Sequence, residues 1–218
     1  MQLLAVRQAR LIAFLNAEEL NPEGRPLAHD FINAFVERYS FLKRPTPEDL
    51  LGDKGVVFEL GRLGDVGIDK ISLFDWGIAV DTSASTEASE GVLQDMLRWG
   101  AENFKLSNRP NLVTRRAYVS ELVISSDVVL PTINPRLQDL GNRITELVTG
   151  YGSQSMPYEI VGIGWGFDAS QSKQLITPFR VERLAEMPFS EKKYYSGAPL
   201  RTSDHIQVIN DLEAALKG

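Results

Sequence analysis

The sequence predicts an α+β or mixed α/β fold, in which a mixed β-sheet of about five to six strands is covered by helices. Two observations favour it. Apolar residues have helical spacing before residue 50, and at Val56 the spacing changes to the two-residue period of a strand. A strand–helix unit also occurs twice, and each helix contains Leu-Gln-Asp, at residues 93–95 and again 44 positions later at residues 137–139. Internal duplication and two ordinary strand–helix units both explain this similarity.

The first 50 residues predict an N-terminal helical hairpin. Residues 3–16 place Leu4, Leu11 and Leu15 on one face of an amphipathic helix. Proline and glycine in residues 21–26 break that helix, and a second one is expected over residues 27–42. We therefore divide the chain into an N-terminal helical segment, residues 1–50, and a single α/β sheet domain, residues 51–218.

The next elements alternate between strands and helices. Val56, Phe58 and Leu60 begin a strand, and the glycine-rich residues 61–67 predict a hairpin turn to a second one. Residues 74–80 are expected to form one extended segment. A long helix follows, in which apolar residues from Leu93 to Phe104 have helical spacing, and after it a central strand is expected over residues 117–124.

The last third of the chain predicts a helix, two strands, a loop and a final helix. The core side of the first helix is expected to consist of Leu137, Leu140, Ile144, Leu147 and Val148. Residues 158–167 and 176–184 are expected to be strands, and residues 188–201 a loop. The final helix begins at Ser203 or Asp204, because Asp204 and Gln207 have capping-box spacing.

Composition excludes several classes of protein. The 218 residues include no cysteine, which excludes disulfides, thiolate metal sites and a cysteine nucleophile. The net charge of -6 disfavours a protein whose whole surface binds polyanions. The N-terminus does not resemble a signal peptide, and no apolar run approaches the roughly 20 residues of a membrane-spanning helix. We expect a cytoplasmic protein that does not enter membranes.

One segment predicts a metal site. Asp81, Ser83 and Ser85 lie between an apolar strand and a helix, and their oxygens are the ligands that Mg²⁺ prefers. This Asp-x-Ser-x-Ser pattern resembles the metal-ion-dependent adhesion site of von Willebrand factor A domains. That resemblance implies further ligands from later loops, for which Thr132 and Asp168 have the right order. The favoured alternative is that Asp81, Ser83 or Ser85 caps the helix, so we expect no cofactor and keep Mg²⁺ as the exception.

Signatures of catalysis are weak. The glycines of residues 162–166 lack dinucleotide-fingerprint spacing, and no phosphate-binding loop of the Gly-Lys-Ser/Thr type occurs. His29 and His205 are the chain's two histidines, and we interpret both as surface or helix-capping residues. The sequence therefore favours a protein that is not an enzyme.

Two segments are candidate contact surfaces. Lys105, Arg109, Arg115 and Arg116 form a basic stretch that predicts a phosphate or an acidic partner, although a solvated loop is the simpler interpretation. Tyr194 and Tyr195 predict protein contact, or cover for the edge of the sheet.

These observations lead to one functional hypothesis and two alternatives. The first is a non-enzymatic protein-binding or assembly subunit of a larger complex, with a protein partner or self-association. The second is a Mg²⁺-dependent binding or hydrolytic protein that uses residues 81–85. The weaker third is nucleic-acid binding through residues 105–116.

Overall fold

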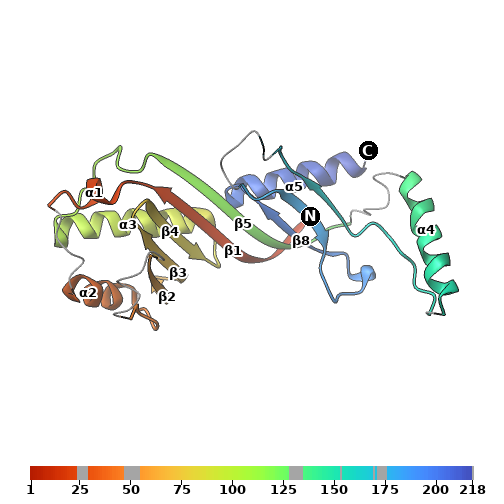
Figure 1. The fold of residues 1–218 in the computed structure, drawn as a ribbon, viewed down its shortest axis with the longest axis horizontal. Coiled ribbons are helices and arrows are strands. Elements are labelled where there is room, and N and C mark those ends of the chain that lie inside the picture. Colours follow the sequence, from red (N-terminus) through yellow and green to blue (C-terminus); the bar gives the residue numbers. More distant parts are fainter. Residues whose placement is uncertain are drawn as a thin grey trace. The chain divides into compact units, whose positions relative to one another are not determined.

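The computed structural model describes most of the chain as strands and helices (Figure 1). The described residues are 1–23, 29–46, 55–127, 135–152, 154–168, 170 and 176–217. The strands are β1 (Gln2–Phe14), β2 (Val56–Leu63), β3 (Val66–Phe74), β4 (Gly77–Thr82), β5 (Arg115–Ser125), β6 (Gly162–Trp165), β7 (Phe179–Arg183) and β8 (Lys193–Ala198). The helices are α1 (Ala17–Leu20), α2 (His29–Tyr39), α3 (Thr86–Phe104), α4 (Pro135–Gly150) and α5 (Thr202–Lys217), with a short 3₁₀ helix at Phe189–Glu191.

The strands form one antiparallel sheet of eight strands in the order β2-β3-β4-β1-β5-β8-β7-β6. The α+β class is confirmed, whereas the prediction of a mixed sheet of about five to six strands is wrong. The extra strands are β1 and β8, which the sequence predicted as a helix and as part of a loop.

The predicted N-terminal helical hairpin is also wrong, because its first helix is strand β1. Leu4, Leu11 and Leu15 fit helical spacing, but the buried side of this segment includes the small residues Ala9 and Ala13. Ala9, Leu11, Ala13 and Leu15 are therefore buried at every second position, which is the period of a strand. The second predicted helix is confirmed as α2, although it ends at Tyr39 and not at Leu42.

The described chain divides into two compact units. Unit 2 contains residues 6–121 and 199–203, and unit 1 contains residues 1–5, 122–198 and 204–218. Strands β1 and β5 each contribute residues to both units.

Unit 2 is built around an aromatic core between its sheet and helices α2 and α3. The β2–β3 hairpin turns at Gly64 and Asp65, as the sequence predicted. Residues 74–80, predicted as one extended segment, instead turn sharply at Asp75 and Trp76 between β3 and β4. Buried aromatic residues of this unit are Phe31, Phe35, Tyr39, Phe41, Phe58 and Trp99.

Unit 1 contains strands β6, β7 and β8 together with helices α4 and α5 (Figure 1). Strand β8 lies in the interior of the sheet, within the segment predicted as the loop 188–201. Residues 158–167 were predicted as a buried strand, but only the four residues of β6 are a strand, and it ends the sheet. Across the described residues, no helix has both the length and the apolar character needed to cross a membrane.

Candidate functional site

Helix α4 exposes a stripe of large apolar side chains. Leu137, Leu140 and Leu147 are 45%, 56% and 40% exposed, and Tyr151, directly after the helix, is 79% exposed. With the half-buried Ile144, these residues recur at intervals of three and four positions. This is the a/d spacing with which one helix packs against another. The sequence correctly identified Leu137, Leu140 and Leu147 as one apolar side, but it placed that side in the core.

The side of α4 beside this stripe is occupied by the chain that follows the helix. The backbone N–H of Tyr158 donates to Thr145 Oγ1 at 2.9 Å. A Cβ at Gly141 would lie 2.4 Å from the Tyr158 carbonyl oxygen, so only glycine permits this close approach. The 154–161 segment thus covers part of α4 and leaves the leucines of the stripe exposed.

Strand β6 adds a second accessible surface in the same unit. It pairs with β7 through one edge and is the last strand of the sheet among the described residues. Val161, Trp165 and Phe167, in and beside β6, are 54%, 52% and 45% exposed. An edge strand without charged side chains can pair with a strand of another chain through its free backbone groups.

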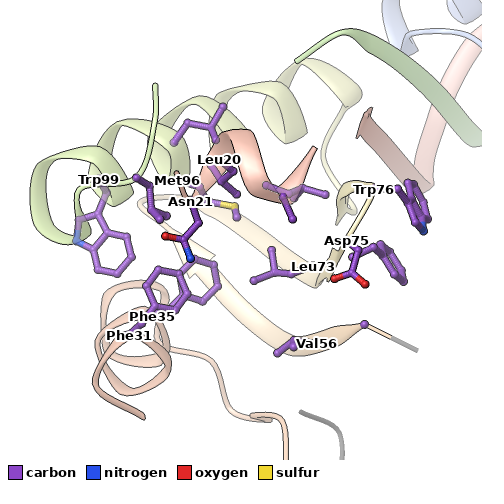
Figure 2. Close-up of a pocket in the computed structure, with 16 residues that line it drawn as sticks. Leu20, Asn21, Phe31, Phe35, Val56, Leu73, Asp75, Trp76, Met96 and Trp99 are labelled. Carbon is purple, nitrogen blue, oxygen red and sulfur yellow. The ribbon is translucent and has the colours of Figure 1, made fainter. Parts of the chain in front are cut away.

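Unit 2 contains a cavity of about 500 Å³ (Figure 2). Helices α2 and α3 and strands β3 and β4 all contribute apolar side chains to its lining. In Figure 2, Phe31, Phe35 and Trp99 lie at one end of the cavity, and Asp75 and Trp76 lie at the other.

The predicted metal ligand Asp81 is engaged by an arginine. Its carboxylate is buried on β4 and accepts two hydrogen bonds from Arg10 on β1, from Nε at 2.6 Å and from Nη2 at 2.9 Å. Hydrogen bonding to Asp81 is the main cause that raises the pKa of Arg10. A paired guanidinium supplies the positive charge that a metal ion would otherwise bring to this carboxylate.

The two predicted serine ligands also have protein partners. Ser85 is the N-cap of α3, and its Oγ accepts from the Ala88 N–H at 3.1 Å. Ser83 Oγ donates to Asp69 at 2.7 Å. The helix-cap interpretation is therefore confirmed for Ser85.

The structure does not place the two remaining predicted ligands, Thr132 and Asp168, at this turn. Asp168 is exposed in unit 1, where its Oδ1 accepts from the backbone and side chain of Ser170, and Thr132 lies outside the described residues. Within the described residues, no group of three metal-binding side chains is assembled. The Mg²⁺ site stays a prediction.

The basic residues 105–116 do not converge on one point. Lys105 caps the C-terminus of α3 in a left-handed conformation, and Arg109 lies in the exposed loop that follows. The Arg115 guanidinium stacks 3.7 Å from the centre of the Phe14 ring, and Arg116 pairs with Glu90 at 3.0 Å. Nucleic-acid binding by this stretch stays a prediction.

Tyr194 and Tyr195 are on strand β8 and not in a loop. Tyr194 is 1% exposed, and burial raises the pKa of its hydroxyl. Tyr195 is half-buried, with the Arg180 guanidinium 5.0 Å from the centre of its ring. Protein contact through these two tyrosines stays a prediction.

His205 is fully buried, so its interpretation as a surface or capping residue is wrong. Its Nε2 lies 2.8 Å from Ser196 Oγ, which also donates to the Arg180 carbonyl oxygen at 2.8 Å. Burial lowers the pKa of His205 to about 4. A serine–histidine pair without solvent access cannot reach a substrate, so this pair is part of the packing of unit 1.

A charged network joins α2 to α3 in unit 2. Asp95 accepts two hydrogen bonds from Arg38 Nη2, one from Arg38 Nε and one from the Tyr39 hydroxyl, and it pairs with Arg98 at 2.8 Å. Burial by itself raises the pKa of Asp95, but these hydrogen bonds outweigh it and hold the pKa below its usual value. The network holds α2 and α3 together, and both helices line the cavity.

The comparisons with known proteins do not assign this chain to a family. No protein-family model matches it. No curated protein matches its sequence either.

Sequence reasoning missed the cavity and the exposure of α4. The cavity brings together residues from several elements far apart in the chain, which no local pattern reveals. The α4 stripe has a local signal, the strict three–four spacing from Leu137 to Tyr151, which is typical of a helix that packs against a single partner helix.

Proposed function

We propose that this protein is a non-enzymatic assembly subunit that self-associates through the exposed apolar stripe of α4. The observation that carries the proposal is the exposure of Leu137, Leu140 and Leu147 on a helix with a/d spacing. Apolar side chains arranged this way are stabilised when a second helix covers them.

A second copy of this chain is the partner that the spacing fits best. The intervals from Leu137 to Leu140, Ile144 and Leu147 are three, four and three, so the part of the stripe that lies within α4 has the same spacing in both directions. In an antiparallel pair, Leu137 would lie opposite Leu147 of the second copy, and Leu140 opposite Ile144. Such a self-complementary surface is what a two-fold dimer requires.

The helix pair would not be the whole interface. Helix α4 has 16 residues and is therefore about 24 Å long. Stable interfaces bury about 1,200–2,000 Å², which is more than a pair of such helices provides. We expect the exposed Val161, Trp165 and Phe167 near β6 to be covered as well.

The test is the solution mass by light scattering, measured over a range of protein concentrations. We expect a dimer for the unchanged protein and a monomer for Leu137→Glu or Leu147→Lys, because each puts a charge into the apolar seam. The double variant should dimerise again, since the introduced carboxylate of one copy would then face the introduced ammonium group of the other across the interface.

Val208→Glu is the matched control. Val208 is 39% exposed on α5 of the same unit, so this variant adds the same charge as Leu137→Glu outside the stripe and should remain a dimer. A protein that is monomeric at all concentrations, or a dimer that neither Leu137→Glu nor Leu147→Lys dissociates, would contradict the proposal.

A further inference from the structure

We infer that the cavity of unit 2 is a binding site for an elongated aromatic or aliphatic amine. Its volume of about 500 Å³ lies inside the range of about 300–1,000 Å³ typical of small-molecule sites. This site belongs to a different unit from α4 and is independent of the self-association proposed above.

One end of the cavity is an aromatic pocket. The rings of Phe31 and Phe35 are stacked with centroids 5.6 Å apart, and the Trp99 ring lies 5.9 Å from each of them. All three are at least nine-tenths buried, and the cavity opens onto them. Rings fixed in this way favour the planar or apolar part of a ligand, because it gains contact area without ordering the wall.

The other end carries the polar recognition group. Asp75 is exposed at the turn between β3 and β4, where its backbone carbonyl accepts from the Ala17 N–H at 3.1 Å and the residue lines the cavity. Beside it, Trp76 is 49% exposed and stacks on Phe74 with ring centroids 4.7 Å apart. A carboxylate next to aromatic faces is an arrangement that binds an ammonium group.

The charge of the cavity gives the sign of the ligand. No lysine or arginine is among the described residues that line it, whereas Asp75 is. A carboxylic acid or a phosphate of the same size would meet repulsion from Asp75, and the described lining residues offer it no compensating cation. As Figure 2 shows, Asp75 and Trp76 lie opposite Phe31, Phe35 and Trp99, so the amine and the apolar part should be separated by a linker.

The test uses three probes with the same shape and different charge: 4-phenylbutylamine, 4-phenyl-1-butanol and 4-phenylbutyrate. Binding is measured by isothermal titration calorimetry at low ionic strength. We expect the amine to bind about tenfold tighter than the acid, with the alcohol between them, because Asp75 attracts one charge and repels the other.

Two variants locate the site. Asp75→Asn should reduce the preference for the amine over the acid to less than about threefold, whereas the exposed Asp65→Asn in the β2–β3 turn should leave it unchanged. Leu73→Trp should abolish binding of all three probes, because Leu73 lies between the two ends of the cavity and a larger ring fills it.

Three results would overturn the inference. They are no binding of any probe at millimolar concentration, equal affinity for all three probes, and amine binding that persists unchanged in Leu73→Trp. The last result would place the amine at another surface of the protein. Equal unfolding temperatures of Asp75→Asn and Asp65→Asn would establish that the two carboxylate variants are equally folded.

Discussion

Helices α3 and α4 both contain Leu-Gln-Asp, and the structure gives the two copies opposite surroundings. In α3, Leu93 is fully buried, and Asp95 is bound by Arg38, Tyr39 and Arg98. In α4, Leu137 is 45% exposed and Asp139 is exposed, with no partner among the described residues. An amphipathic pattern therefore identifies the apolar side of a helix but not the surface that covers it.

The largest expected difference is between the two leucines. Leu93→Ala should lower the free energy of unfolding by about 2–5 kcal/mol, because it leaves a cavity in the core of unit 2. Leu137→Ala should change it by less than about 0.5 kcal/mol in the monomer, because the side chain is already exposed. Urea unfolding at low protein concentration measures both values. Equal losses would mean that α4 packs against its own chain.

Substitutions of the two aspartates should differ in their effect on stability by somewhat less than those of the two leucines. Asp95→Ala should cost about 2–3 kcal/mol, since it leaves the buried Tyr39 hydroxyl without its acceptor and removes the partner of Arg38. Asp139→Ala, at the same place in the repeated tripeptide, should have no measurable effect. The unfolding temperatures of the two variants provide the measurement, and a stable Asp95→Ala would refute the structural role of the network.

Acid should weaken the packing of unit 1 through His205. An unfolded histidine takes up a proton near pH 6.5, whereas the folded one does so only at about 4. Between these values the unfolded state binds more protons, so stability falls as the pH is lowered from 6.5 to about 4. The total loss is about 3 kcal/mol.

The check is the slope of unfolding free energy against pH in the unchanged protein and in His205→Asn. The variant removes the titrating group, so its slope between pH 6.5 and 4 should be smaller, whatever its absolute stability. Identical slopes would show that His205 does not contribute to the acid sensitivity.

The sequence predicted elements whose signals are local. The β2–β3 hairpin follows from its alternation and from Gly64, and helix α3 from its spacing and from the cap Ser85. Strand β1 was missed because Ala9 and Ala13 are too small to stand out among larger leucines. Strand β8 was missed because its inward side includes Ser196, whose hydroxyl is satisfied by partners from other elements.

The candidate sites were harder to predict because they depend on residues that are far apart in the sequence. Asp81, Ser83 and Ser85 have the residue types of a metal site, but Arg10, which binds Asp81, is 71 positions away in sequence. The cavity depends on how α2, α3, β3 and β4 pack, which no single segment specifies. Leu137, Leu140, Ile144 and Leu147 of the α4 stripe were predicted as one apolar side, whereas Tyr151 and the exposure of the leucines were found only in the structure.

The most direct measurement of the central claim is disulfide formation between single-cysteine variants of α4. The chain has no cysteine of its own, so Leu137→Cys and Leu147→Cys each introduce the only thiol. In an antiparallel pair, two copies of residue 137 are about 15 Å apart along the helix, whereas residue 137 faces residue 147. We predict that a mixture of the two variants forms a covalent heterodimer under oxidising conditions and that neither variant alone cross-links efficiently. Cross-linking of each variant with itself, or no cross-linking in the mixture, would contradict the antiparallel pairing of α4.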